Sequence, residues 1–194
     1  MRAIRRFGLL RGDSNVSEGL GTGAVVVDTS VLINLLHTKR LHLFCTSGPF
    51  KLVVTPEVIE EITRPEQRQL VADVISAARL CEEALHGSAS LRLYAEFRNS
   101  MGKGEAASLA LAIQRSWRIA SDEKGAFRRA AAKHLGTDNV LTTVSLYLAL
   151  IRSGQLSVED ADQDKALLET RRFQMPFASF ADIMVGQSTI DKRR

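Results

Sequence analysis

The sequence has little of what secreted, membrane or zinc-finger proteins require. Its two cysteines, Cys45 and Cys81, form no CxxC pair and have no Cys/His ligand spacing. Neither a zinc knuckle nor a disulfide framework is therefore supported. No apolar run is long enough for a membrane span, and the first residues lack the apolar stretch of a signal peptide. We expect a cytoplasmic protein with reduced thiols.

Aromatic residues are also scarce, at 6% of the chain, and they predict no platform on which nucleic-acid bases would stack. Charge of one sign is not in large excess either, because 26 Lys and Arg against 22 Asp and Glu leave a formal net charge of +4. This mild excess is compatible with a polyanionic partner but does not predict one. The 194 residues suit one globular domain with one core.

Short apolar runs alternate with helical patterns along the chain. Buried strands are predicted at residues 24–28, 51–54, 117–121 and 139–142. Strands that alternate with helices pair in parallel through right-handed crossovers. We therefore predict an α/β fold, a three-layer α/β/α sandwich with a central parallel sheet of four to five short strands.

Apolar residues at helical spacing fill most of the chain between these strands. The expected helices lie at residues 31–36, where Thr29-Ser30 would provide the N-cap, and at 56–62, 66–86, 91–97, 105–114, 123–135, 143–152 and 157–172. Gly87-Ser88 is predicted to break the long helical stretch. The expected organisation is a flexible leader at 1–22, a folded domain at 23–186 and a basic tail at 187–194.

Two acids follow predicted strands, Asp28 after the first and Asp122 after the third. In an open parallel sheet, ligands bind beyond the carboxyl ends of the strands, most often where the strand order reverses. Taken singly, each acid is equally well explained as a helix N-cap. Carboxylates gathered without matching cations repel one another, and Mg²⁺ or Mn²⁺ with oxygen ligands is the usual remedy.

Four segments, in the expected order, resemble the acidic motifs of the PIN-domain nuclease family, which includes VapC-like toxin ribonucleases. These segments are Val25–Leu36, Val54–Ile62, Gly104–Ala112 and Ile119–Lys124. The resemblance covers residues 24–180 and implies a PIN-like fold. It implies that the catalytic acids are Asp28, Glu61, Glu105 and Asp122.

The resemblance also implies a division of roles within the site. Asp28, Glu105 and Asp122 would be metal ligands, and Glu61 would hold water at the metal. Thr29 or Ser30 would hydrogen-bond the site, and Asn34 would orient Asp28. These supporting residues have plainer explanations as well: Asn34 as a polar residue on a partly buried helix, and Glu105 as an acid that complements the helix dipole.

One departure from the family pattern leaves the fourth acid open. Many members have Thr-any-Asp at the last motif, whereas this chain has Ser121-Asp122-Glu123. Either Asp122 or Glu123 can therefore be the acid that faces the metal. We expect Asp122, because a residue at the end of a strand points into the crevice while Glu123 begins the next helix.

The resemblance implies phosphodiester hydrolysis of RNA with Mg²⁺ or Mn²⁺. Lys124, Arg128 and Arg129 follow Asp122 and are candidate RNA-binding residues, although a solvated charged face explains them equally well. Small prokaryotic members are commonly toxins paired with an antitoxin protein and are often homodimers, so the resemblance suggests both partners here.

Three alternative functions fit the sequence less well. A haloacid-dehalogenase phosphotransferase requires a second Asp two residues after Asp28, where Ser30 stands. A P-loop NTPase requires upstream glycine spacing and a Ser or Thr after Lys103, and the chain has neither. The alternative from another class is a non-catalytic PIN-like module that binds RNA or protein, and metal titration distinguishes it from a nuclease.

Overall fold

One sheet of five parallel strands forms the centre of the molecule. The computed structural model describes residues 23–184, so the predicted leader 1–22 and tail 187–194 lie outside the described residues. The strands are β1 (Ala24–Val27), β2 (Lys51–Val54), β3 (Cys81–Glu82), β4 (Arg118–Ala120) and β5 (Val140–Leu141). Their order in the sheet is β3-β2-β1-β4-β5. The predicted parallel sheet is confirmed.

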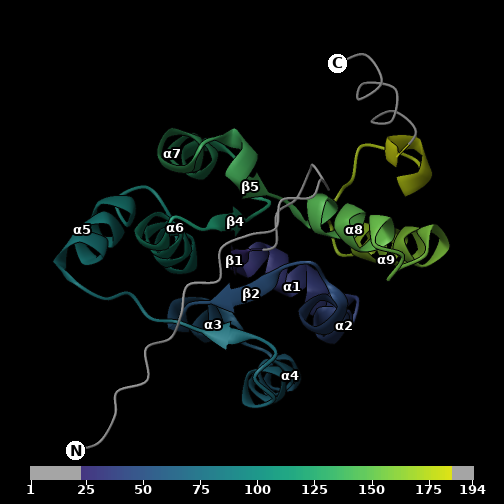
Figure 1. Cartoon of the computed structure of the whole chain (residues 1–194), viewed down its shortest axis with the longest axis horizontal. Helices are drawn as coiled ribbons and strands as arrows, with labels where there is room; N and C mark the ends of the chain where they lie inside the picture. The colour runs from purple at the N-terminus through teal and green to yellow at the C-terminus, as the bar shows by residue number, and fades with distance from the viewer. Residues whose placement is uncertain (1–22, 185–194) are drawn as a thin grey trace, which may run out of the picture.

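Helices cover both faces of this sheet. They are α1 (Thr29–His37), α2 (Leu41–Ser47), α3 (Pro56–Glu61), α4 (Pro65–Ser76), α5 (Ser88–Phe97), α6 (Lys103–Arg115), α7 (Gly125–Leu135), α8 (Thr143–Arg152) and α9 (Val158–Thr170), with a 3₁₀ turn at Thr137–Asn139. Figure 1 shows α5, α6 and α7 on one side of the sheet and α1, α2, α8 and α9 on the other. The three-layer α/β/α architecture is confirmed. No helix among the described residues is long and apolar enough to cross a bilayer.

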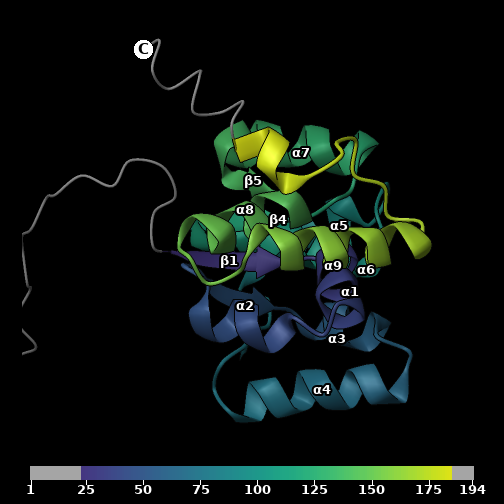
Figure 2. The ribbon, with the colours of Figure 1, turned by 90° about the vertical axis from the view of Figure 1, so that its right-hand side faces the viewer.

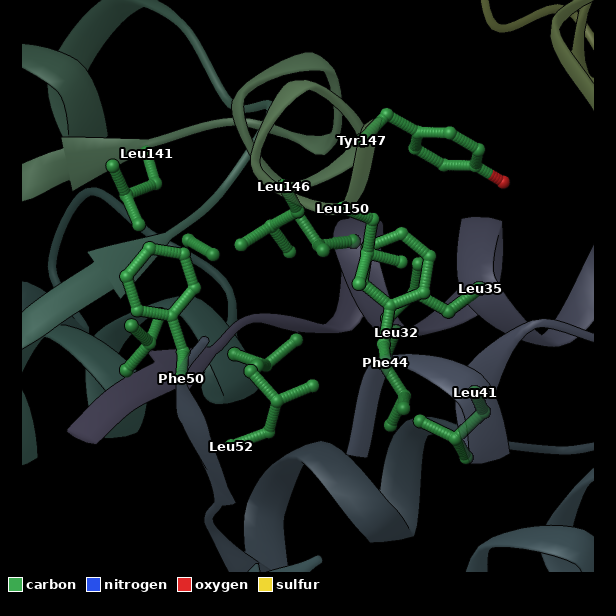
Figure 3. Close-up of a cluster of buried hydrophobic side chains, with 14 of the residues drawn as sticks. Leu32, Leu35, Leu41, Phe44, Phe50, Leu52, Leu141, Leu146, Tyr147 and Leu150 are labelled. Carbon is green, nitrogen blue, oxygen red and sulfur yellow. The ribbon is translucent and has the colours of Figure 1, made fainter. Parts of the chain in front are cut away.

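Successive residues of the strands point to opposite faces of the sheet, so the apolar runs supply two separate cores. Val25 and Val27 belong to the larger cluster, which includes the buried faces of α1, α2 and α8 (Figure 3). Val26 belongs to the smaller cluster, together with the alanine-rich face of α6. Burial on both faces is why these strands have continuous apolar runs rather than alternating ones.

A buried polar network ties the segment after α1 to α8 and α9. The oxygen of the Tyr147 hydroxyl lies 3.1 Å from both Asp164 Oδ2 and Thr38 Oγ1, so its one hydrogen is shared between these two acceptors. Arg40 Nε donates to the same Asp164 oxygen at 2.7 Å. A buried carboxylate with a cation and a hydroxyl donor is stable only while both remain in place. The network therefore fixes α9 relative to α1, the helix that follows Asp28.

Three local predictions were wrong. Cys81 and Glu82 were predicted in a helix but form β3, where they pair with Val53 and Val54 of β2. The helix α2 was not predicted at all. Thr29-Ser30 was expected to cap α1, yet the helix begins at Thr29 and Asp28 stands at the cap position without a side-chain capping bond. A capping role therefore does not explain Asp28.

Candidate active site

The topology brings Asp28 beside the end of β4. The chain runs from β1 outward to β2 and β3, and then returns to place β4 on the other side of β1. The backbone N–H of Asp28 donates to the carbonyl of Ala120 at 3.0 Å. The carboxyl ends of β1 and β4 therefore meet where the strand order reverses, which is where open α/β sheets bind ligands.

The carboxylate of Asp28 is buried and only half satisfied. The residue is 1% exposed. Its Oδ2 accepts hydrogen bonds from Ser30 Oγ and Ser121 Oγ, both at 3.0 Å, whereas its buried Oδ1 has no partner among the described residues. Burial raises the pKa of Asp28, the backbone N–H of Thr29 and the two hydroxyls lower it, and the nearby Glu123 carboxylate raises it further. An orphaned buried carboxylate oxygen is costly unless a ligand satisfies it.

Backbone N–H groups hold these two serines in place. The N–H of Asp122 donates to Ser30 Oγ, and the N–H of Glu123 donates to Ser121 Oγ, each at 3.2 Å. Each hydroxyl thus accepts from the backbone of the last motif and donates its own hydrogen to Asp28. Ser30, one of the two hydroxyl residues expected at the site, thus donates to Asp28, and Asp28 is linked directly to the turn after β4.

Glu61, at the end of α3, is held by residues of two other helices. Thr29 Oγ1 donates to Glu61 Oε2, and the N–H of Gly104 donates to Glu61 Oε1 at 2.7 Å. A Cβ on Gly104 would collide with the Glu61 carboxylate, so only glycine allows this close approach. The neighbouring Glu60 is exposed and pairs with Lys103 at the surface. Of these two adjacent acids, Glu61 is therefore held at the site and Glu60 is at the surface.

Glu105, in the first turn of α6, faces the other carboxylates. Burial is the main cause that raises the pKa of Glu105. The charges of Glu123 and Asp28 raise it further, and that of Glu61 has the smallest effect. Four carboxylates from α3, α6 and the ends of β1 and β4 therefore interact electrostatically. Mutual repulsion of this kind makes a shared cation favourable.

Asp122 points away from this group. Its Oδ1 accepts from the Thr143 N–H at 2.9 Å, and its Oδ2 accepts from Thr143 Oγ1 at 2.5 Å and Asn34 Nδ2 at 3.0 Å. Burial raises the pKa of Asp122, and these bonds from Thr143 and Asn34 lower it. The expected orientation of Asp122 toward the other acids was wrong, and it is Glu123 that faces them.

The predicted contact of Asn34 was also wrong. Asn34 was expected to orient Asp28, but its amide donates to Asp122 and to Thr143 Oγ1. The signal for Glu123 was present in the sequence, since Glu123 occupies the third place of the Thr-any-Asp pattern. No local signal indicated Thr143, which lies 21 residues after Asp122.

A cavity of about 460 Å³ opens beside Asp122 and Glu123. Of the predicted RNA-binding residues, Lys124 lines this cavity, while Arg128 and Arg129 are exposed on α7. The sequence reasoning missed the other cations of the lining, Arg171 and Arg172, which follow α9.

The residues suit a hard divalent cation, because every ligand atom that they offer is a carboxylate oxygen. The orphaned Oδ1 of Asp28 supports this fit. In the described part of the chain, however, no three acids, histidines or cysteines stand at the mutual distances of a ready-made metal site. The carboxylates would have to move toward one another to bind an ion together.

The fold and the acids agree with a comparison to known families. A family model described as a PIN domain matches residues 24–173, which include Asp28, Glu61, Glu105 and Glu123. A search of curated proteins gave no match. The family match spans well over half of the 194 residues. The chain therefore belongs to the PIN-domain family.

Proposed function

We propose that the protein is a metal-dependent endoribonuclease that hydrolyses RNA phosphodiester bonds. The observation that carries the proposal is the buried Asp28 carboxylate, which has one oxygen without a partner among the described residues and two acidic neighbours, Glu105 and Glu123. PIN domains are generally nucleases, which supports hydrolysis of nucleic acid. The cations beside the acids support an anionic polymer as the substrate.

The proposed metal ligands are Asp28, Glu105 and Glu123. When bound, Mg²⁺ or Mn²⁺ would activate water for attack on the phosphate and stabilise the charge of the displaced oxygen. Glu123 takes the place that the sequence reasoning gave to Asp122, because its charge, and not that of Asp122, acts on both other ligands.

The remaining residues position these acids. Ser30 and Ser121 hold Oδ2 of Asp28, which leaves Oδ1 available as a ligand atom. Thr29 and the N–H of Gly104 fix the Glu61 carboxylate, which we propose orients the attacking water. Asp122 is a positioning residue, since its bonds to Thr143 and Asn34 secure the turn from which Glu123 projects.

Partners are proposed from the family resemblance. We propose that RNA contacts Lys124, with Arg128 and Arg129 farther along α7, that an antitoxin protein inhibits the enzyme, and that the chain forms a homodimer. Co-expression with the product of a neighbouring small reading frame tests the antitoxin, and the mass in solution tests the dimer. A product that neither co-purifies nor reduces toxicity, or a monomeric mass, would contradict them.

The test of function is cleavage of a single-stranded RNA by the purified chain with Mg²⁺, Mn²⁺ or excess EDTA. We expect cleavage with either metal and none with EDTA, and we expect Mn²⁺ alone to raise the melting temperature. Glu61→Gln should lose activity, whereas Glu60→Gln is the matched control, because Glu60 pairs with Lys103 at the surface. Undiminished cleavage in EDTA contradicts the metal mechanism. RNA binding without cleavage under any condition favours the non-catalytic alternative.

A further inference from the structure

The cavity beside Glu123 combines three kinds of lining. Asp122 and Glu123 form its acidic side. Ile33 and Phe173 give it an apolar wall, and both side chains also pack against the larger core cluster. Its cations are Lys124, Arg171 and Arg172. A nucleotide presents an anionic phosphate together with a base whose flat faces pack on apolar side chains, so this lining matches both parts of one nucleotide.

The two arginines come from the segment that follows α9. Figure 2 shows this segment rising from the end of α9, and its two arginines line the same cavity as Lys124, the residue before α7. The polar network of Tyr147, Asp164 and Arg40 fixes α9 against the segment after α1. The arginines are therefore carried on a fixed helix end beside the acids rather than on a long loop.

The backbone at Arg172 is unfavourable for an arginine. The N–H of Arg172 donates to the Glu169 carbonyl and that of Phe173 to the Leu168 carbonyl, the pair of bonds that usually places glycine at this position. Arg172 has φ of 68° there, in the left-handed region. Three other helices end on non-glycine residues with positive φ, so this conformation alone does not indicate a functional residue. Arg172 differs from them because it lines the cavity beside Glu123.

The cations of the cavity are free to bind an anion. Arg171, Arg172 and Lys124 are exposed, and none belongs to an ion pair among residues 23–184. Asp122, on the acidic side of the cavity, is already occupied by Thr143 and Asn34. Guanidinium groups bind phosphate through two parallel hydrogen bonds, which makes arginine the more specific phosphate ligand.

We propose that this cavity binds the nucleotide next to the scissile phosphate of a single-stranded RNA, with Arg171 and Arg172 on its phosphate and Ile33 and Phe173 against its base. The inference rests on the proposed nuclease function and specifies its substrate. A volume of about 460 Å³ is in the range of small-molecule sites. An apolar wall can contact only a base that is unpaired, so a duplex does not fit.

The first experiment measures RNA binding by the full chain in EDTA, using the anisotropy of a short fluorescent single-stranded RNA at several salt concentrations. We compare the wild type with Arg171→Gln and Arg172→Gly. Each variant should lower the affinity about tenfold and reduce the salt dependence by roughly 0.7 per lost phosphate contact. Arg92→Gln is the matched control, because Arg92 is exposed on α5, across the sheet from α9.

Arg172→Gly separates binding from folding. Glycine adopts the left-handed conformation without strain, so this variant should melt at or above the wild-type temperature while it binds RNA more weakly. A merely structural role of Arg172 predicts unchanged binding. In cleavage assays with Mn²⁺, both arginine variants should raise KM more than they lower kcat.

The outcomes distinguish the subsite from the nuclease. If both arginine variants bind RNA as tightly as the wild type, or if Arg92→Gln loses as much affinity as they do, the subsite proposal is overturned. The proposed nuclease function is not affected by either result. Binding that depends on the arginines in a protein that never cleaves RNA overturns the nuclease and leaves the subsite. A wild type that binds no single-stranded RNA, or that binds duplex RNA equally well, also overturns the subsite.

Discussion

Replacing Asp28 with Asn tests the site at its most buried acid. The amide oxygen of the new side chain would still accept from Ser30 and Ser121, so the geometry of the turn should be kept. The amide nitrogen would take the position of Oδ1, which has no partner among the described residues. The substitution thus removes one negative charge and one ligand atom and changes little else.

The sign of the stability change follows from the raised pKa of Asp28. Folded Asp28 keeps its proton to a higher pH than the unfolded chain does, so the wild type loses stability as pH rises from about 4 to the folded pKa. The mutant lacks this loss. In that window its free energy of unfolding, relative to the metal-free wild type, should rise by about 1.4 kcal/mol per pH unit, with no further change above the folded pKa. An unpaired buried amide costs about 1–3 kcal/mol, but this offset does not depend on pH.

The assay is urea unfolding of both proteins between pH 4 and 8, with and without Mn²⁺, followed by RNA cleavage. Mn²⁺ at 100 times its Kd would stabilise the wild type by roughly 2.7 kcal/mol and the mutant by less. Loss of a residue that only supports a ligand typically costs 10–100-fold in metal affinity or activity, so we expect cleavage to fall by more than about 100-fold. If the mutant cleaves RNA at near the wild-type rate, Asp28 has no role in the mechanism. If the difference in unfolding free energy between the two proteins does not change with pH, the pKa of folded Asp28 is not raised.

Two further predictions concern the neighbours of Asp28. Glu123→Gln should abolish cleavage and leave the melting temperature nearly unchanged, whereas Asp122→Asn should destabilise the fold by about 1–3 kcal/mol, because it disturbs the bonds from Thr143 and Asn34. Thermal melts and cleavage rates of the two variants test this. If Asp122→Asn abolishes cleavage without lowering the melting temperature and Glu123→Gln stays active, Asp122 is the metal ligand. Gly104→Ala should lower cleavage at least tenfold with a small change in melting temperature, because its Cβ displaces only the ends of the Glu61 and Thr29 side chains. Unchanged activity would show that the position of Glu61 does not matter.

Most of the sheet was predictable because four strands are buried on both faces. Runs such as Ala24–Val27 are apolar at every position, as is typical of parallel strands covered on both faces. The edge strand Cys81–Glu82 is too short to show any period, and its neighbours Leu80 and Leu85 fit a helical spacing equally well. The position of β3 is set by its pairing with β2, which a local pattern does not record.

The site was predictable as far as strand ends and motifs reach. Asp28 follows from its position after a buried strand, and Glu61 and Glu105 follow from the motifs. The direction of Asp122 depends instead on hydrogen bonds from Thr143, on another helix. Arg171 and Arg172 are brought beside Glu123 only by the packing of α9, so the local sequence contains no sign of them.

The lengths of the edge strands affect how another protein can bind. β3 and β5, the two edges of the described sheet, contain two residues each. A partner chain that extends a sheet obtains its affinity from a row of main-chain hydrogen bonds, and a two-residue edge offers too few. The same shortness protects the sheet from edge-to-edge aggregation. Complexes of this domain should therefore form through helix surfaces and the loops at the carboxyl ends of the strands, and not by strand addition.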